Sequence, residues 1–221
     1  MSLKDMPVQR LRLEYTKGEP LRYASHLDMM RLWERALRRA SLPVAHSQGF
    51  NPRPRIVMAA PLPTGVTSRA ELLDVFLTEG LDSGDALRRL NDTLPPGAQV
   101  TRAWEVPLKG PALMALRGVA EFQARVRWDG AAHALEGRLR EWMAQDSVIR
   151  ERQKKGRTGA YDLRPLVERL WVVGRGEGGF VVGMRLKAEP DGTGRPDEAL
   201  KSLGLWDDAR GVERTALVLP V

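Results

Sequence analysis

The segment SHLDMMRLWERALRRAS, residues 25–41, decides how the first half of the chain folds, because it predicts a helix from Ser25 to about Ser41. Ser25 is a good N-cap, and Asp28 three residues later completes a capping-box-like pair. Pro43 ends the helix because it cannot continue the backbone hydrogen bonds. The apolar residues at helical spacing are expected to face the core, and they are Leu27, Met30, Trp33, Leu37 and Ala40.

The rest of the first half places strands around this helix. Alternating or apolar runs predict the strands, and Asp82 or Ser83 is expected to cap a second helix. The expected order is a strand at 9–16, the helix, strands at 56–60 and 71–78, the second helix, and a strand at 98–106. This βαββαβ order is the ferredoxin-like arrangement.

The second half approximately repeats that order. We expect a strand at 121–128, a helix at 131–145, extended segments at 147–152 and 161–173, a strand at 180–187, a helix from Pro196, and a strand at 212–219. The predicted fold class is therefore α+β, with two tandem ferredoxin-like halves at residues 1–110 and 111–221.

A proline-rich basic loop follows the first helix. Its sequence NPRPR, residues 51–55, constrains Asn51 and Arg53 to extended geometry because each precedes a proline. In a fully extended segment Arg53 and Arg55 point the same way. Such pre-ordering lowers the entropy cost of binding, so we interpret the loop as presenting arginines to a polyanion. The alternative is a stiff connector that happens to be basic.

Positive charge is concentrated in two segments of this chain of net charge +7. Residues 22–55 contain seven arginines against two acidic residues, and residues 150–164 contain six basic residues against two acidic ones. Clustered charge of this kind favours a nucleic acid or another polyanion as partner. The alternative is scattered surface charge that serves solubility.

The second basic segment, RERQKKGRTGAYDLRP, covers residues 150–165. KKGR predicts a turn at the tip of a hairpin, Tyr161 can stack on a base, and Asp162 can orient Arg164 or Arg157. The alternative is a solvated hairpin whose charges protect a sheet edge. We expect the two basic segments to share one face of the molecule. The predicted nucleic-acid-binding residues are Arg31, Arg35, Arg38, Arg39, Ser47, Gly49, Asn51, Arg53, Arg55, Lys154, Lys155, Arg157, Tyr161 and Arg164.

His26 is the candidate catalytic residue. It lies in the first turn of the predicted helix, where it can meet a phosphate or act as a general acid or base. The alternative is a surface or packing histidine. With three histidines and no cysteine, we expect no metal site and no cofactor.

The run GRGEGG, residues 174–179, matches G-x-G-x-x-G only by count. A dinucleotide site needs a helix after the glycines, and here the strand-like FVVGMRLK follows. We therefore interpret this run as a flexible hairpin loop.

The absence of cysteine excludes disulfides, thiolate nucleophiles and iron–sulfur clusters held by this chain. No stretch of apolar residues is long enough for a membrane span, and the first residues do not read as a signal peptide. The expectation is a cytoplasmic protein.

Most of the chain resembles a bacterial domain family of unknown function, the radical-SAM-associated family. The matching features are HLD at 26–28, ERALRRA at 34–40, SQGFNPRP at 47–54, PLPTGV at 61–66, the strand containing Asp74, LNDTLPPG at 90–97, and KKGR with YDLRP within 154–165. The resemblance implies partnership with a radical SAM protein and no established activity.

Three hypotheses about function follow from these patterns. The first is an accessory RNA-binding domain that works with a radical SAM partner and is not itself an enzyme. The second is a metal-independent enzyme acting on RNA, with His26 as acid or base and Arg53 or Arg55 stabilising phosphate charge. The third is a protein-binding module for a radical SAM enzyme.

Overall fold

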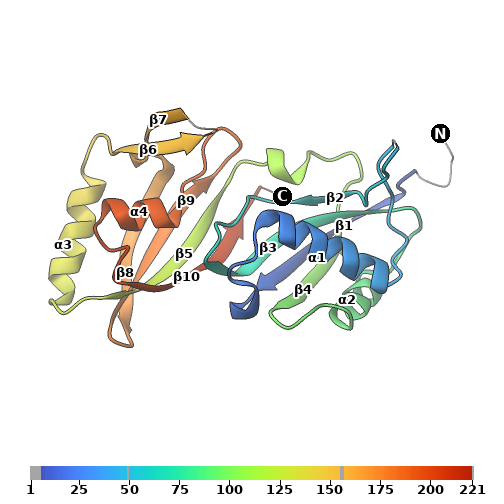
Figure 1. Cartoon of the computed structure of the whole chain (residues 1–221), viewed down its shortest axis with the longest axis horizontal. Coiled ribbons are helices and arrows are strands. Elements are labelled where there is room, and N and C mark those ends of the chain that lie inside the picture. Colours follow the sequence, from blue (N-terminus) through green and yellow to red (C-terminus); the bar gives the residue numbers. More distant parts are fainter. Residues whose placement is uncertain (1–5, 49, 155–156, 221) are drawn as a thin grey trace. The chain divides into compact units, whose positions relative to one another are not determined.

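The computed structural model describes residues 6–48, 50–154 and 157–220. The chain divides into two compact units, Met1–Leu116 and Arg117–Val221, which are described separately below. The described residues form a mixed α+β protein with four α-helices (Figure 1). None of these helices combines the length and the apolar character that a membrane crossing requires.

The first unit has the element order predicted for it. Its elements are β1 (Gln9–Lys17), α1 (His26–Arg39), β2 (Ile56–Met58), β3 (Val66–Leu77), α2 (Ser83–Asn91) and β4 (Ala98–Glu105). The strands pair in the order β4-β1-β3-β2, and every pair is antiparallel. The main difference is β3, which begins five residues before the predicted strand because Val66–Ala70 also adopts extended geometry.

One face of this sheet forms the core of the first unit together with α1 and α2. Leu11, Leu13 and Tyr15 alternate along β1 and are buried against residues of both helices, including Trp33 and Leu90. The rings of Tyr15 and Trp33 meet edge to face, with centroids 4.8 Å apart. Figure 1 shows α1 lying across the strands on this face.

The helix α1 begins as predicted but turns a different stripe toward the core. The backbone N–H of Asp28 donates to the hydroxyl of Ser25, and the backbone N–H of Ser25 donates to the Asp28 carboxylate, so the capping box is confirmed. Leu27 is 53% exposed, so its predicted core position is wrong. Met29 and Trp33, four residues apart, are buried. At about 100° per residue, Leu27 lies about 160° around the helix from Met29 and about 120° from Trp33.

The opposite face of the same sheet holds a buried ion cluster. Asp74 is completely buried and accepts from the Nε atoms of Arg10 at 2.9 Å and Arg12 at 2.8 Å. Arg10 also donates to the carbonyls of Gly110 and Pro111. The cluster therefore joins β1, β3 and the chain that follows β4.

The second unit contains a four-stranded sheet and a separate two-stranded ribbon. Its elements are β5 (Gly118–Arg127), α3 (Ala132–Met143), β6 (Ile149–Lys154), β7 (Arg157–Asp162), β8 (Val167–Gly176), β9 (Gly179–Ala188), α4 (Pro196–Ser202) and β10 (Ala209–Val218). The sheet order is β10-β5-β9-β8, and the ribbon is β6-β7. Buried residues face each other across β5 and β9, as in the pairs Phe122 with Met184 and Ala124 with Val182.

Two sequence-based expectations for this unit are wrong. Residues 161–173 do not form one extended segment, because a single helical turn at Arg164–Leu166 separates β7 from β8. Pro165 lies in that turn and has no N–H for a strand ladder. The second is the extent of the loop at 174–179, where the predicted hairpin is confirmed but β8 and β9 pair as far as Gly176 and Gly179. Gly178, with φ of 72°, supplies the tight turn between them.

Candidate nucleic-acid interface

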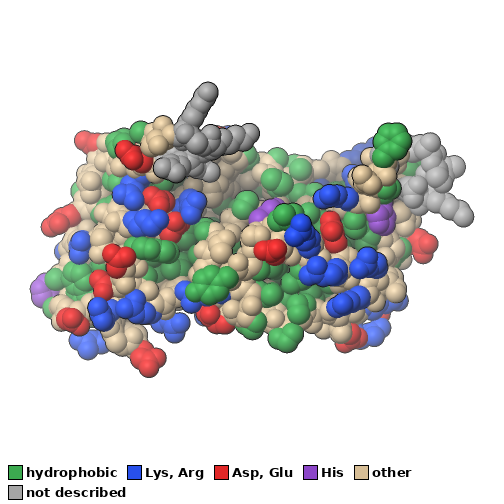
Figure 2. Space-filling model, viewed as in Figure 1, with side chains coloured by type: hydrophobic (Ala, Val, Ile, Leu, Met, Phe, Trp, Pro, Cys, Tyr) green, Lys and Arg blue, Asp and Glu red, His purple; other side chains and the backbone are tan. Residues whose placement is uncertain are grey.

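The outer face of α1 is basic and open to solvent. Arg31, Arg35, Arg38 and Arg39 are all exposed, while Leu32 and Ala36 between them are buried. This separation follows from the helical period, which turns the apolar stripe inward and leaves the arginines outside. Figure 2 shows basic side chains gathered over α1.

These α1 arginines differ from those of α2 in how their charge is balanced. On α2, Arg88 and Arg89 both pair with Asp85, at 2.5 and 2.7 Å. In the part of the chain that the structure describes, no ion pair is found for Arg31, Arg35, Arg38 or Arg39. The guanidinium groups of α1 therefore form no ion pair that an external anion would have to displace, whereas those of α2 are partly neutralised by Asp85.

The NPRPR loop is closed at its base by backbone hydrogen bonds. The N–H of Ser47 donates to the carbonyl of Arg53 at 2.7 Å, and the N–H of Arg55 donates to the carbonyl of Ala45 at 2.7 Å. The hydroxyl of Ser47 also accepts from the N–H of Arg53 at 3.0 Å. Ser47, predicted to bind nucleic acid, thus holds the loop closed.

The loop leaves its cationic side chains in solvent. Asn51, Arg53 and Arg55 are exposed, and the guanidinium of Arg55 lies 4.6 Å from the centre of the Phe76 ring. Stacking on Phe76 restricts Arg55 and reduces the entropy it loses on binding. No ion pair is found for Arg53 or Arg55 among the described residues, and Gly49 lies outside them.

The second basic segment forms the predicted hairpin. Residues Ile149–Lys154 and Arg157–Asp162 pair as an antiparallel ribbon, with Lys154 opposite Arg157. Lys155 lies outside the described residues, and only the backbone of Lys154 and Arg157 is described. A shared face for the two basic segments remains a prediction.

Tyr161 and Arg164, at the base of this hairpin, have defined surroundings. Arg164 donates to the carbonyl of Met143 from both Nε and Nη2, and to the carbonyl of Val167 from Nη1. Asp162 accepts from backbone N–H groups, so it does not orient Arg164 through the guanidinium as we expected. These bonds hold the turn between β7 and β8, and they occupy donors that a phosphate would need.

Tyr161 lines an open cavity of about 790 Å³ in the second unit. Burial and the nearby Glu198 carboxylate raise the pKa of the Tyr161 phenol. The hydroxyl therefore stays protonated at neutral pH and can donate a hydrogen bond. Two acidic residues of the cavity form ion pairs, because Asp197 pairs with Arg195 and Lys201 while Glu198 pairs with Lys201 and Arg150.

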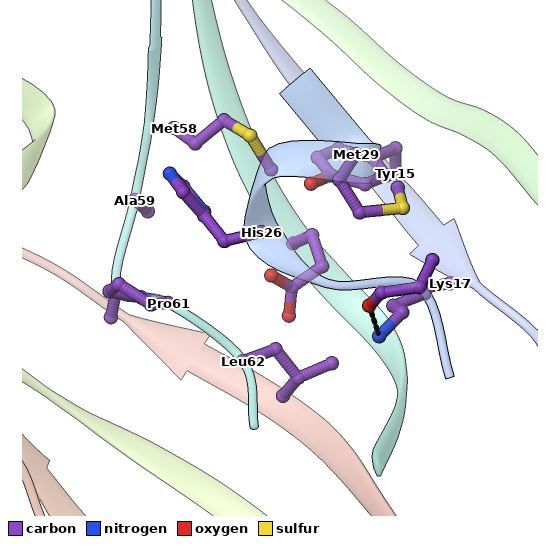
Figure 3. Close-up of a pocket in the computed structure, with 11 residues that line it drawn as sticks. Tyr15, Lys17, His26, Met29, Met58, Ala59, Pro61 and Leu62 are labelled. Atoms are coloured by element: carbon purple, nitrogen blue, oxygen red, sulfur yellow. Dashed lines mark hydrogen bonds between the residues drawn. The ribbon is translucent and has the colours of Figure 1, made fainter. Parts of the chain in front are cut away.

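His26 lies at the mouth of a small pocket in the first unit (Figure 3). The pocket has a volume of about 10 Å³, which is roughly the room that one water needs. Its lining residues come from β1, the start of α1 with the residues before it, β2 with the segment after it, and β3; they are Tyr15, Lys17, Ala24, His26, Met29, Met58, Ala59, Ala60, Pro61, Leu62 and Glu71. A nucleotide does not fit inside, so only a group presented at the mouth can meet His26.

Three of these residues carry proton-transfer groups that sequence reasoning missed. Tyr15, Lys17 and Glu71 are nearly completely buried. The ammonium group of Lys17 donates to the carbonyls of Arg22 at 3.2 Å and Ala24 at 3.0 Å. His26 lies at the exposed N-terminal end of the helical line that Met29 and Trp33 continue, and no pattern in the sequence linked it to the three buried residues. No group of acidic residues and histidines suited to a metal ion occurs in the described residues.

Comparisons with known proteins give a family and little else. No curated protein matches the sequence. A chain from a crystal structure of a Cbf5-Nop10-Gar1 complex is 10% identical with a TM-score of 0.47, over 97% of this chain and 49% of that chain. This chain thus spans about half the length of that one. Ferric DtpA from Streptomyces lividans is 11% identical with a TM-score of 0.27, over 99% of this chain and 89% of that chain.

Both TM-scores are too low to support an inference about function. The family result is firmer, because one family model matches residues 10–196, most of the 221-residue chain. The chain therefore belongs to the family of uncharacterized proteins conserved in bacteria that is designated DUF2344.

Proposed function

We propose that this protein is an accessory RNA-binding domain that holds the phosphate backbone against the outer face of α1 and the NPRPR loop. The observation that supports it best is the set of exposed arginines without ion pairs among the described residues, on α1 and in the loop. An unpaired guanidinium offers a planar fork of donors that matches two phosphate oxygens. Each such contact releases condensed counterions from the nucleic acid, which favours binding.

The first prediction is a steep salt dependence of RNA binding. We expect log K for a single-stranded RNA to fall linearly with log salt, by about 0.7 for each phosphate contact. Fluorescence anisotropy over a salt series measures this slope, with DNA of the same sequence as the comparison. Polyglutamate is the control for a polyanion without phosphates, and we expect it to bind much more weakly. Absence of RNA binding at low salt, or a slope near zero, would contradict the proposal.

A second candidate function is acid–base chemistry on RNA at the His26 pocket. The observation in its favour is that the fold places Tyr15, Lys17 and Glu71 around the pocket that His26 borders. A histidine beside such groups can take or give a proton at a phosphate ester presented at the mouth. The pocket's small volume and the exposure of His26 make binding the better-supported role.

The second prediction separates these two functions by a single substitution. If the protein only binds, His26→Ala should weaken RNA binding by roughly tenfold, the scale of one hydrogen bond to a charged group, and no product should appear. Incubation of labelled RNA with purified protein in a metal chelator, followed by gel analysis, reads out cleavage. Cleavage by the parent that His26→Ala slows by roughly 10²–10⁴-fold, with binding retained, would instead establish catalysis.

The proposal also covers the fold of each unit, the partner of the protein and its location in the cell. We propose that both units are ferredoxin-like. The βαββαβ order and the β4-β1-β3-β2 sheet of the first unit support this, as does the β10-β5-β9-β8 sheet of the second, with β6-β7 as an added ribbon. The proposed radical SAM partner is supported by the sequence resemblance. The proposed cytoplasmic location is supported by the lack of cysteine.

A further inference from the structure

Phe50 directly precedes NPRPR and places an aromatic ring in solvent at the tip of the loop that Ser47 and Arg53 close. Phe50 has a relative exposure of 106%, the largest of any exposed large hydrophobic residue in the described chain. An apolar ring of this size is more stable out of water, so its position at the tip is unfavourable for the free protein. Sequence reasoning passed over Phe50, because a phenylalanine beside Gly49 and Asn51 in a loop has no periodicity to mark it.

The loop presents this ring from a closed base. Two backbone hydrogen bonds join residues 45–47 to residues 53–55, and His46 and Pro54 form a bridge between them. Both sides of that base also bond to β3, since Ala45 donates to the carbonyl of Phe76 and Phe76 donates to the carbonyl of Arg55. The base of the loop is thus an extension of the sheet, which limits the entropy that the tip loses when a partner covers it.

The neighbours of Phe50 indicate what covers it. Asn51, Arg53 and Arg55 follow it and are exposed, and neither arginine has an ion pair among the described residues. A protein pocket that receives a phenylalanine is usually apolar, and burying these arginines at its rim without acids would be costly. A nucleotide suits both the apolar ring and the unpaired arginines, because the flat face of its base stacks on the ring and its phosphate binds the guanidinium groups.

We propose that the Phe50 ring stacks on an unpaired base, and that the protein therefore takes single-stranded RNA rather than duplex. This inference rests on the proposed function and narrows its substrate class. In an A-form duplex the bases stack on each other and their faces are closed to side chains, whereas loops and single strands expose them. The arginines bind phosphates of either form, so Phe50 supplies the preference between the two forms.

The test compares a single-stranded RNA with a blunt duplex of the same sequence, using the whole chain. Phe50→Ala should weaken binding to the single strand by about 5- to 150-fold, the range for loss of one base–aromatic stack, and leave duplex binding unchanged. The salt slope should not change, because no phosphate contact is removed. Phe50→Trp should retain the affinity, and Phe50→Leu should lose most of it. Met114→Ala, which removes another exposed apolar side chain of the first unit, is the matched control.

A base analogue gives an independent readout. The fluorescence of 2-aminopurine in the single strand should be quenched by the parent and by Phe50→Trp, and not by Phe50→Ala. Equal affinity for both RNA forms, or an equal loss for both in Phe50→Ala, overturns the stacking role while RNA binding itself stands. Full affinity in Phe50→Leu overturns it as well, since an apolar contact with a protein or groove would then suffice. Absence of binding to either RNA form overturns both this inference and the proposed function.

Discussion

Asp74→Ala is expected to lower the free energy of unfolding of the first unit by about 3–5 kcal/mol, the cost of removing one partner from a buried ion pair. Asp74 is completely buried and has two guanidinium partners, Arg10 and Arg12, which are themselves 2% and 7% exposed. Alanine leaves both cations in a low-dielectric site without their counterion. Chemical denaturation followed by circular dichroism measures the loss.

The position of the cluster explains why the effect should be this large. Besides Asp74, Arg10 holds the carbonyls of Gly110 at 3.1 Å and Pro111 at 2.8 Å, so the chain after β4 depends on its orientation. Phe76 lies under the guanidinium groups of both Arg10 and Arg55. Loss of Asp74 should therefore also loosen the base of the NPRPR loop, because Phe76 and Arg55 share a backbone hydrogen bond.

The matched control for this prediction is Asp85→Ala on α2. Asp85 also has two arginine partners, but those partners, Arg88 and Arg89, are exposed. Exposed ion pairs contribute little because water and salt screen them, so stability should change only slightly. Equal losses in the two variants would mean that burial of Asp74 is not what makes its ion pairs matter.

Replacing Arg31, Arg35, Arg38 and Arg39 together by alanine is expected to lower RNA affinity by roughly 10²–10³-fold at about 0.1 M salt. If each arginine meets one phosphate, the slope of log K against log salt falls by about 0.7 for each, or up to about 2.8 in all. The electrostatic contribution vanishes near 1 M salt, so a slope change of that size translates into this loss at the lower salt. Fluorescence anisotropy measures both quantities.

Folding should survive this change, because the four side chains are exposed and alanine has the highest helix propensity. The control is Arg88→Ala with Arg89→Ala on α2, whose guanidinium groups already pair with Asp85. It removes two charges and should change the slope little. A loss per charge as large as on α1 would show that net charge, and not the α1 face, attracts the RNA.

Several features of the first unit follow from local rules and were predicted from the sequence. The capping box of Ser25 and Asp28 depends on residues three apart, and the burial of Trp33 and Leu37 depends on the helical period. Apolar periodicity did not place Leu27 correctly, because the buried stripe of Met29, Leu32 and Trp33 lies on another side of α1.

Long-range features lay beyond such rules. Asp74 is more than sixty residues from Arg10 and Arg12, and the three meet only because β1 and β3 pair with Arg12 opposite Asp74. A shift of one residue in that register would turn these side chains to the other face. Similarly, His26 borders the same pocket as Lys17 and Glu71 only after α1 packs on the sheet.

Short sequence patterns thus determine the helices and most strands of this protein, because capping, periodicity and proline geometry act within a few residues. The sequence alone also shows which segments of the chain are basic. Which arginines have their donors occupied depends in part on pairing across the fold, as Arg10 and Arg164 demonstrate. The exposure of Phe50 is decided in the same way, since an apolar residue becomes a surface feature only when no other part of the fold packs over it.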